Sequence, residues 1–303
     1  MVVTAAIILI SAFAGYLAIH FYYAYKTLHP KILANNKTPQ DYGMQYSEHH
    51  VITDDKYKIL VWVINNIKQE GVIVLSHNLG ANMSKMLPYA KFLFDSGYSV
   101  VLFDYRNHGE SDRYKLFWGV FKVLEKDLEE VICLIRKLYD MKEVPIGLMG
   151  FSMGTIPVIP LAANISEVKA VILDCGPFIS IKSIFKSTFK RMNISFKWAV
   201  PWLYIWFIRL MLGRSTKFIK KAVGQISPKP ILFIHGEKDS IIPCECTKLL
   251  FDEHAKEPKD YWLVPSSHHL TAYVLYPAEY SGKVLEFFGK YIKLNSEQYA
   301  KDL

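Results

Sequence analysis

Hydrophobic and polar positions alternate along most of the chain, from residue 43 onward, between short β-branched runs and longer stretches of helical periodicity. This pattern is typical of an α/β protein with a mostly parallel central sheet and helices on both faces. The first two strands are expected to form an antiparallel pair. The last six runs are almost continuously apolar, as expected of strands covered on both faces. The predicted strands are Tyr46–Ile52, Lys58–Ile64, Val72–Leu75, Val100–Phe103, Ile146–Met149, Ala170–Leu173, Ile231–Ile234 and Tyr261–Val264.

Helical patterns fill most of the gaps between these strands. No strand pattern occurs from Gly176 to Gly224, which predicts a helical cap inserted at residues 176–229. The core then comprises residues 44–175 and 230–303, a size that one hydrophobic core can hold. The predicted helices outside the cap are Ser84–Ser96, Gly119–Tyr139, Met153–Asn164, Pro243–Ala255 and Ala278–Lys293.

The first segment of the chain is long and apolar. Val2 to Tyr25 is interrupted only by Thr4, Ser11 and His20, and as a helix it would extend for roughly 36 Å, enough to cross a bilayer. We therefore predict a transmembrane anchor at residues 1–25 and a linker at residues 26–43. A cleaved signal peptide is the alternative, but the apolar run is long for one and lacks a basic start.

Aromatic and basic residues mark the end of this segment, as they do at a membrane interface. Because positively charged flanks stay in the cytoplasm, we expect a single-pass anchor with the folded part of the chain on the cytoplasmic face. The residues concerned are Tyr22, Tyr23, Tyr25, Lys26, Lys31 and Lys37.

One short motif has the composition and position of a nucleophile elbow. Gly150-Phe151-Ser152-Met153-Gly154 follows a predicted strand directly and precedes a helical stretch. Such a turn holds its serine in a strained conformation with the hydroxyl exposed, and side chains two positions away on either side would collide with neighbouring backbone. Ser152 is the predicted nucleophile.

A serine hydroxyl needs a base to take its proton and an acid to orient that base. Asp239 lies in the loop after strand Ile231–Ile234 and is the predicted acid, with Asp174, at the end of the preceding strand, as the alternative. His268 and His269 follow the last strand, at a carboxyl end where an α/β site is assembled. One of the two is the base. The chain pattern favours His269, with His268 facing solvent or backbone.

The order of three segments, GFSMG at 150–154, HGEKDSIIP at 235–243 and PSSHH at 265–269, resembles the α/β-hydrolase superfamily over residues 40 to 295. The segments at 76–80 and 103–112 are similar to its His-Gly loop and its DxRxHGxS loop. The resemblance implies an α/β-hydrolase fold without a cofactor. It also selects His269, because the catalytic histidine of that family stands five residues after a Val-Pro pair. Thr38–Gly43 behind an apolar N-terminus is similar to membrane-anchored bacterial and archaeal hydrolases grouped with lysophospholipases and serine aminopeptidases.

The same loops imply an oxyanion hole formed by the backbone N–H groups of Leu79 and Met153. Asn78 departs from the family pattern, since glycine is usual there, and it changes the expected path of the loop. Four further polar residues of these loops have no spacing typical of metal ligands, so we expect them to form loop hydrogen bonds and ion pairs. They are His77, Asp104, Arg106 and His108.

Charge separates the cap from the rest of the chain. Residues 175–236 contain eleven Lys or Arg and no Asp or Glu, although the whole chain has a net charge of only +8. The pattern at Ile181–Met192 predicts a basic amphipathic helix, and Trp198–Ile208 is apolar but too short to span a bilayer. We expect the cap to place its lysines on anionic lipid headgroups, the alternative being a solvated basic face. Nucleic acid is not an expected partner, because the aromatic residues do not alternate with lysines.

Cysteine usage gives no indication of a zinc site or a disulfide scaffold. Cys133, Cys175, Cys244 and Cys246 lack paired CxxC spacing and are expected to be reduced thiols.

Together these features predict a serine hydrolase that cleaves a carboxylic ester or thioester, of a lipidic acyl chain, through an acyl-enzyme on Ser152. The alternatives are a serine peptidase acting on short peptides and a hydrolase-fold protein that binds a ligand or partner without catalysis. No cofactor and no metal are expected.

Overall fold

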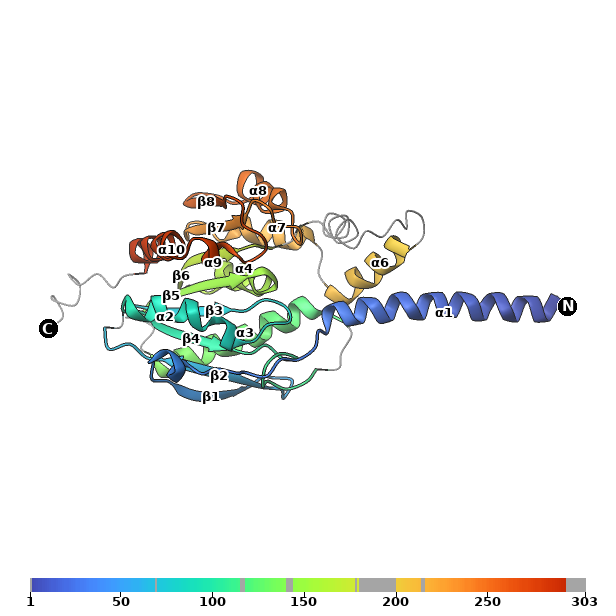
Figure 1. Ribbon diagram of the computed structural model, residues 1–303, viewed down its shortest axis with the longest axis horizontal. Coiled ribbons are helices and arrows are strands. Elements are labelled where there is room, and N and C mark those ends of the chain that lie inside the picture. The colour runs from blue at the N-terminus through green and yellow to red at the C-terminus, as the bar shows by residue number, and fades with distance from the viewer. Residues whose placement is uncertain are drawn as a thin grey trace.

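The computed structural model describes residues 2–68, 70–114, 118–139, 144–177, 179, 200–213 and 216–292. Its strands form one eight-stranded sheet in the order β1-β2-β4-β3-β5-β6-β7-β8, shown in Figure 1. β2 pairs antiparallel with β1 and β4, and the remaining pairs, from β4–β3 across the sheet to β7–β8, are parallel. The strands are β1 (Ser47–Ile52), β2 (Lys58–Ile64), β3 (Val72–Ser76), β4 (Ser99–Phe103), β5 (Ile146–Phe151), β6 (Val168–Asp174), β7 (Ile231–Gly236) and β8 (Lys259–Val264).

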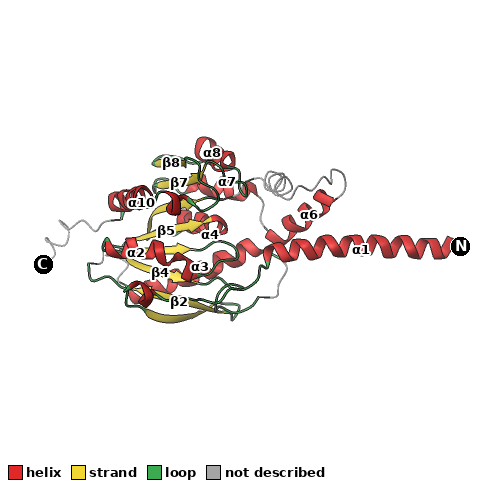
Figure 2. Cartoon of the chain, in the orientation of Figure 1, coloured by secondary structure: helices red, strands yellow, loops and turns green. Residues whose placement is uncertain are grey.

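Helices cover both faces of this sheet, as Figure 2 shows. Buried side chains of α2, α9 and α10 share one hydrophobic cluster, and those of α3, α4, α7 and α8 share the other, on the opposite face. The α/β fold class predicted from the sequence is confirmed. The helices are α1 (Val2–Leu28), α2 (Leu87–Asp95), α3 (Val120–Leu138), α4 (Thr155–Asn164), α6 (Val200–Leu212), α7 (Thr216–Gln225), α8 (Cys244–Glu253), α9 (Ala272–Leu275) and α10 (Pro277–Tyr291), and short 3₁₀ turns lie at η1 (Pro39–Tyr42), η2 (Met83–Met86) and η3 (Ser152–Gly154).

The last strand differs from its prediction. β8 lies at the edge of the sheet, where Asp260 and Leu263 are exposed and Val264 is its one fully buried residue. The prediction that this strand is covered on both faces is therefore wrong. An apolar run of four residues is compatible with either position, because an edge strand also carries large side chains, here Tyr261 and Trp262, whose outer faces reach solvent.

The N-terminal helix is longer than the predicted anchor and does not end in a free linker. α1 runs to Leu28 and is long and apolar enough to cross a membrane. Beyond it, Asn35 donates a hydrogen bond from Nδ2 to Asp104 Oδ2 at 2.7 Å, and the Asn82 side-chain amide donates to the Leu33 and Ala34 carbonyls. The segment after the helix is thus fastened to the loops that follow β3 and β4.

The cap is described only in part. The amphipathic helix predicted at Ile181–Met192 lies outside the described residues, whereas α6 and α7 lie within them. α7 packs against α4 through Ile219, Ala222 and Val223, which are buried. Lys229, one of the eleven basic residues, donates hydrogen bonds to the carbonyls that end α4.

A buried ion pair anchors the loop after β4 to α3. The Arg106 guanidinium donates to Asp127 Oδ1 from Nε at 2.8 Å and to Asp55 Oδ2 from Nη1 at 2.7 Å. It also stacks on the rings of Tyr57 and Tyr114. Both Arg106 and Asp127 are almost completely buried, so removing Arg106 leaves Asp127 without its charge partner, and removing Asp127 leaves Arg106 with Asp55 alone.

We expect Asp127→Ala to lower the free energy of unfolding by about 3–5 kcal/mol, because it leaves the Arg106 charge buried with only the peripheral Asp55 as a partner. Lys91→Ala is the matched control: it breaks an ion pair with Asp95 whose two side chains are about half exposed, and should cost less than about 1 kcal/mol. Chemical denaturation of the two variants measures both values, and equal losses would contradict the assignment.

Candidate active site

Ser152 occupies a sharp turn between β5 and α4. Its backbone φ is +51°, in the left-handed region that residues other than glycine rarely adopt. Such a conformation costs on the order of 1–3 kcal/mol, and the surrounding structure must impose it. The result is a half-buried serine placed at the carboxyl end of the central strand, with β5 ending at the residue before it.

The two glycines of the motif are required by close backbone contacts. A Cβ on Gly154 would lie 2.1 Å from the Ser76 carbonyl oxygen, and one on Gly150 would lie 2.7 Å from the Gly154 carbonyl oxygen. In addition, Ser76 donates a hydrogen bond from Oγ to the Gly154 carbonyl at 2.8 Å. The elbow is therefore pressed directly against the end of β3, from which the Leu79 loop begins.

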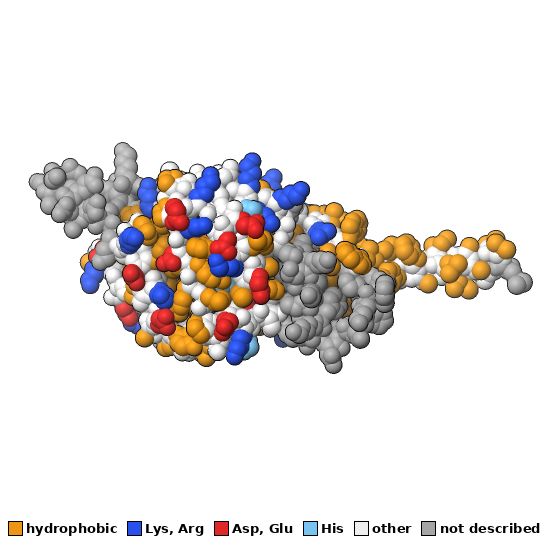
Figure 3. Space-filling model, turned by 90° about the horizontal axis from the view of Figure 1, so that it is seen from above, with side chains coloured by type: hydrophobic (Ala, Val, Ile, Leu, Met, Phe, Trp, Pro, Cys, Tyr) orange, Lys and Arg blue, Asp and Glu red, His pale blue; other side chains and the backbone are white. Residues whose placement is uncertain are grey.

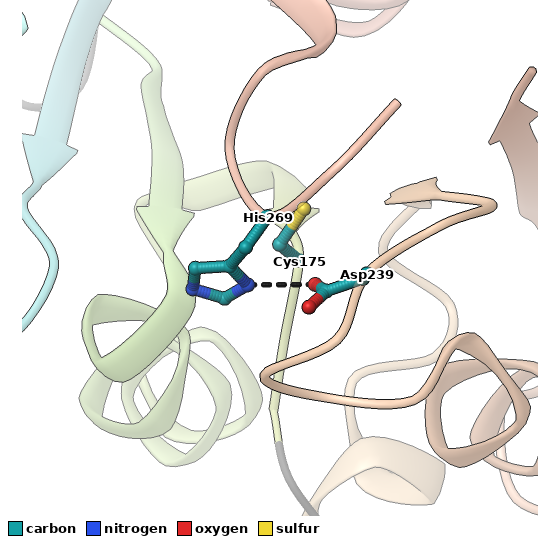
Figure 4. Close-up of side chains that lie close together, drawn as sticks. All are labelled: Cys175, Asp239 and His269. Atoms are coloured by element: carbon teal, nitrogen blue, oxygen red, sulfur yellow. Dashed lines mark hydrogen bonds and ion pairs between the residues drawn. The ribbon is translucent and has the colours of Figure 1, made fainter. Parts of the chain in front are cut away.

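The structure brings the side chains of Ser152, His269 and Asp239 into one hydrogen-bonded chain. His269 Nε2 lies 2.9 Å from Ser152 Oγ, and His269 Nδ1 lies 2.6 Å from Asp239 Oδ2. Figure 4 shows the imidazole directed at the carboxylate. In this arrangement Nδ1–H donates to Asp239, so Nε2 presents its lone pair to the serine hydroxyl, as a general base must.

Asp239 is held as a carboxylate. Its Oδ1 accepts hydrogen bonds from the backbone N–H groups of Ile241 and Ile242 at 2.8 and 2.9 Å. Burial acts to raise the pKa of Asp239, but hydrogen bonds from His235 and His269 outweigh it and hold the pKa well below its ordinary value. A negative charge is therefore present at Asp239 to stabilise a protonated His269.

His235 is a site residue that sequence reasoning missed. It is completely buried, and its Nε2 lies 2.9 Å from the Ile242 carbonyl oxygen and 3.2 Å from Asp239 Oδ2. Since Nε2 faces two acceptors it carries the proton, and Nδ1 accepts from the Thr247 hydroxyl at 2.8 Å. The sequence feature that could have indicated this role is the position of His235 at the end of a buried strand, four residues before Asp239.

The two alternatives left open by the sequence occupy other positions. The Asp174 carboxylate accepts a hydrogen bond from the Tyr280 hydroxyl at 2.5 Å, and burial raises its pKa. His268 is exposed, and its Nδ1 lies 3.1 Å from the Lys238 carbonyl oxygen. The structure thus brings Asp239 and His269, not Asp174 and His268, to Ser152.

Leu79 and Met153 line one small cavity beside the elbow, with a volume of about 20 Å³, roughly that of a single water molecule. Leu28 and His29, at the end of α1, form part of its wall. Apolar side chains of α3 form another part. The remaining lining residues are Arg106, Asn107, His108, Tyr114, Val120, Val123 and Leu124.

Two buried histidines hold the loop that carries Leu79. Burial lowers the pKa of His77 to about 4, and burial together with the neighbouring His77 ring lowers that of His108 to about 3, so both rings are neutral near pH 7. Each uses its free lone pair: His77 Nε2 accepts from the Tyr105 N–H and His108 Nε2 from the Gly80 N–H, both at 3.1 Å. These histidines have structural roles, as expected.

The remaining polar residues of these loops are also paired. The Asp104 carboxylate accepts hydrogen bonds from the backbone N–H groups of Met83 and Glu110, at 2.7 and 3.0 Å. Arg106 belongs to the buried ion pair with α3. Asn78, the departure from the family pattern, donates from Nδ2 to the Leu79 carbonyl at 3.3 Å.

Cys175 lies beside the acid and the base, as Figure 4 shows. Among the described residues, Cys175, Asp239 and His269 have ligand atoms close enough together to consider a metal ion. However, burial raises the pKa of the Cys175 thiol well above its usual range, and its sulfur accepts a hydrogen bond from the Leu270 N–H at 3.3 Å. Asp239 and His269 already bond to each other, so this donor set fits proton transfer better than metal binding.

Comparison with known proteins shows which families and folds the chain resembles. A family model described as "Serine aminopeptidase, S33" matches residues 67–211, which include the β5 elbow. An esterase of Pyrococcus furiosus, Pf2001, superposes with a TM-score of 0.73 over 88% of this chain and 98% of that one, at 23% identity, and shows the same fold. The chain thus has the fold of these hydrolases, and residues 67–211 are similar in sequence to the serine aminopeptidase family.

Three sequence relatives match between about half and four fifths of the chain. The protein YqkD of Bacillus subtilis is 26% identical over 82% of this chain and 77% of its own length. The monoglyceride lipase of Rattus norvegicus is 26% identical over 53% of this chain and 52% of its own. The membrane protein YNL320W of Saccharomyces cerevisiae is 24% identical over 77% and 76%.

Replacing the predicted acid without changing its shape should remove most of the hydrolytic activity. We expect Asp239→Asn to lower kcat by about 10⁴-fold, because an amide cannot favour the His269 tautomer that faces Ser152. Asp174→Asn is the matched control and should leave the kcat of the folded protein close to that of the parent. Steady-state kinetics on a soluble ester measure both, and a larger loss in Asp174→Asn would assign the acid to that residue.

Asp239 should also make stability depend on pH. Its pKa is lower in the folded chain than the ordinary value of about 4, so its stabilising contribution is complete above that value and is lost as the pH falls through and below it. The free energy of unfolding of the parent should exceed that of Asp239→Asn at pH 7, and the difference should shrink toward pH 3. A difference that does not change with pH would contradict the lowered pKa.

Proposed function

We propose that this α/β hydrolase is a serine hydrolase that cleaves a carboxylic ester or thioester, of a lipidic acyl chain, through an acyl-enzyme at a membrane surface. The observation that carries the proposal is the unbroken hydrogen-bonded chain from Ser152 through His269 to the ionised Asp239. A hydroxyl, a neutral imidazole and a carboxylate in this order are the three groups that acyl transfer to serine requires.

In the proposed reaction, Ser152 Oγ attacks the substrate carbonyl carbon while its proton moves to His269 Nε2. Asp239 stabilises the imidazolium that forms, and His235 and the Ile241 and Ile242 amides keep the carboxylate in place. The proton then passes to the departing alcohol or thiol as the tetrahedral intermediate collapses to the acyl-enzyme. Water, deprotonated by His269, releases the acid and restores the hydroxyl.

The developing negative charge needs donors near the serine. We assign this role to the backbone N–H groups of Leu79 and Met153, because both residues line the cavity beside the elbow and Met153 follows the nucleophile at the start of a helical turn. The hydrogen bond from the Gly80 N–H to His108 Nε2 fixes the loop next to Leu79, the first of these donors.

An acyl substrate is supported by similarity to a monoglyceride lipase. The side chains of Leu28, Val120, Val123 and Leu124 beside the elbow are apolar, but the cavity that they line holds about one water molecule and must widen to admit an acyl chain. The peptidase alternative is favoured by the description of the matching family model. Yet the described lining of the cavity includes no carboxylate that would bind a peptide amino terminus. We therefore place the ester first and the short peptide second.

Membrane attachment is the second part of the proposal. We propose that α1 is a single-pass anchor, that residues 26–43 connect it to a core of residues 44–175 and 230–303, and that residues 176–229 form a cap whose basic residues contact anionic headgroups from the cytoplasmic side. The length and hydropathy of α1 and the similarity to a yeast membrane protein support the anchor.

Labelling by a fluorophosphonate probe tests the enzymatic proposal. The parent protein and Ser281→Ala, which removes a partly exposed hydroxyl on α10, should react with the probe, and Ser152→Ala should not. Absence of labelling in folded parent protein would favour a hydrolase-fold binding protein.

A chain-length series of acyl esters, compared with aminoacyl amides, tests the substrate class. We expect kcat/KM to rise with acyl length, because each added methylene buried against the apolar lining contributes up to about 0.8 kcal/mol. Higher kcat/KM for the amides would assign the protein to the peptidases.

A further inference from the structure

Helix α6 exposes a row of large apolar side chains. The exposed fractions of Trp202, Trp206 and Leu210 are 64%, 54% and 40%. They stand four residues apart, so they share one face of the helix. The opposite face is used for packing, since Ile205 and Ile208 are buried in the core cluster. Two exposed tryptophans on one helix face are unusual on a surface that meets only water.

This helix packs directly against α1. The rings of Phe207 and Phe21 meet edge to face, with centroids 5.5 Å apart. The Tyr204 hydroxyl lies 2.5 Å from Thr27 Oγ1. Figure 1 shows α6 beside the end of α1 that joins the body, and Figure 3 shows that the hydrophobic side chains of α1 continue onto the body at this junction. The position of α6 is thereby fixed relative to the proposed anchor.

The length of the free part of α1 determines how deeply this junction lies in a bilayer. Every residue from Val2 to Gly15 is exposed, and burial of the helix against the body begins at Tyr16. These fourteen residues extend for about 21 Å, whereas the hydrocarbon core is about 30 Å thick. If the described helix, from Val2, spans this thickness, it also immerses about six further residues, from Tyr16 to Phe21, which lie within the part that packs on the body.

We infer that α6 is a second membrane-contacting element, immersed beside α1 at the bilayer boundary with Trp202, Trp206 and Leu210 facing lipid. Phe21 must lie at the hydrocarbon edge, and α6 contacts it through Phe207. Tryptophan is the residue that favours this depth, and an exposed arginine on the same helix, Arg209, can extend to the headgroups. The inference rests on the proposed anchoring of α1 and is independent of catalysis.

The arrangement also relates the membrane to the active site. α1 ends at Leu28, and this residue and His29 line the cavity that contains Leu79 and Met153. With Phe21 at the hydrocarbon edge, Leu28 lies seven residues farther along α1, so this wall of the cavity stands about 10 Å outside the hydrocarbon core, on the membrane-facing side of the body.

Quenching of tryptophan fluorescence by brominated lipid tests the inference on the full chain. The protein is reconstituted into phosphatidylcholine vesicles with and without bromine on the acyl chains, and flotation verifies its insertion. We expect strong quenching of the parent, and loss of a large part of it in Trp202→Phe/Trp206→Phe. Trp262→Phe, which removes a half-buried tryptophan from the distant edge strand β8, is the control and should retain the parent's quenching.

The possible failures are distinguishable. Protein that does not float with vesicles overturns both the anchor and the position of α6. If the protein floats, but the Trp202→Phe/Trp206→Phe variant is quenched as strongly as Trp262→Phe, the contact of α6 with lipid is overturned and the anchor is not. Quenching is measured without substrate, so an inactive but inserted protein with the expected quenching would overturn the hydrolase proposal and support this one.

Discussion

The imidazole of His269 bridges two groups that the chain keeps far apart in sequence. Ser152 is 117 residues away and Asp239 is 30 residues away, yet both lie within hydrogen-bond distance of the one ring. This is possible because β5, β6, β7 and β8 are parallel neighbours in register, so their carboxyl ends meet at one edge of the sheet. The close backbone contacts of Gly154 restrict the position of Ser152, and the hydrogen bonds to Asp239 restrict the position of its carboxylate. Both hydrogen-bond partners of the His269 ring are therefore held in place.

The sequence identified much of this arrangement because local patterns determined it. The last six strands could be located from nearly continuous apolar runs, and the first two as a predicted antiparallel pair. The elbow could be located from its two glycines and its place between a strand and a helix. The order of strands could not be read in this way. β4 lies between β2 and β3, and β8 lies at an exposed edge, as a result of long-range pairing that leaves little trace in hydrophobicity alone.

The choice between the candidate site residues also depended on the three-dimensional structure. Asp174 and Asp239 both follow buried strands, and His268 and His269 are adjacent, so spacing left both pairs open. The structure separates them by their partners: Tyr280 binds Asp174 and the Lys238 carbonyl lies beside His268. His235 was overlooked for the same reason, because its role depends on the fold of a loop four residues further on.

The account depends most directly on Ser152 accepting an acyl group. The full chain should be mixed with an excess of an activated acyl ester, quenched in acid during turnover, digested, and mapped by mass spectrometry. The account predicts the acyl mass on the peptide that contains Ser152, and its disappearance in the Ser152→Ala variant. Turnover without an adduct on that peptide, or an adduct on Cys175 instead, would contradict it.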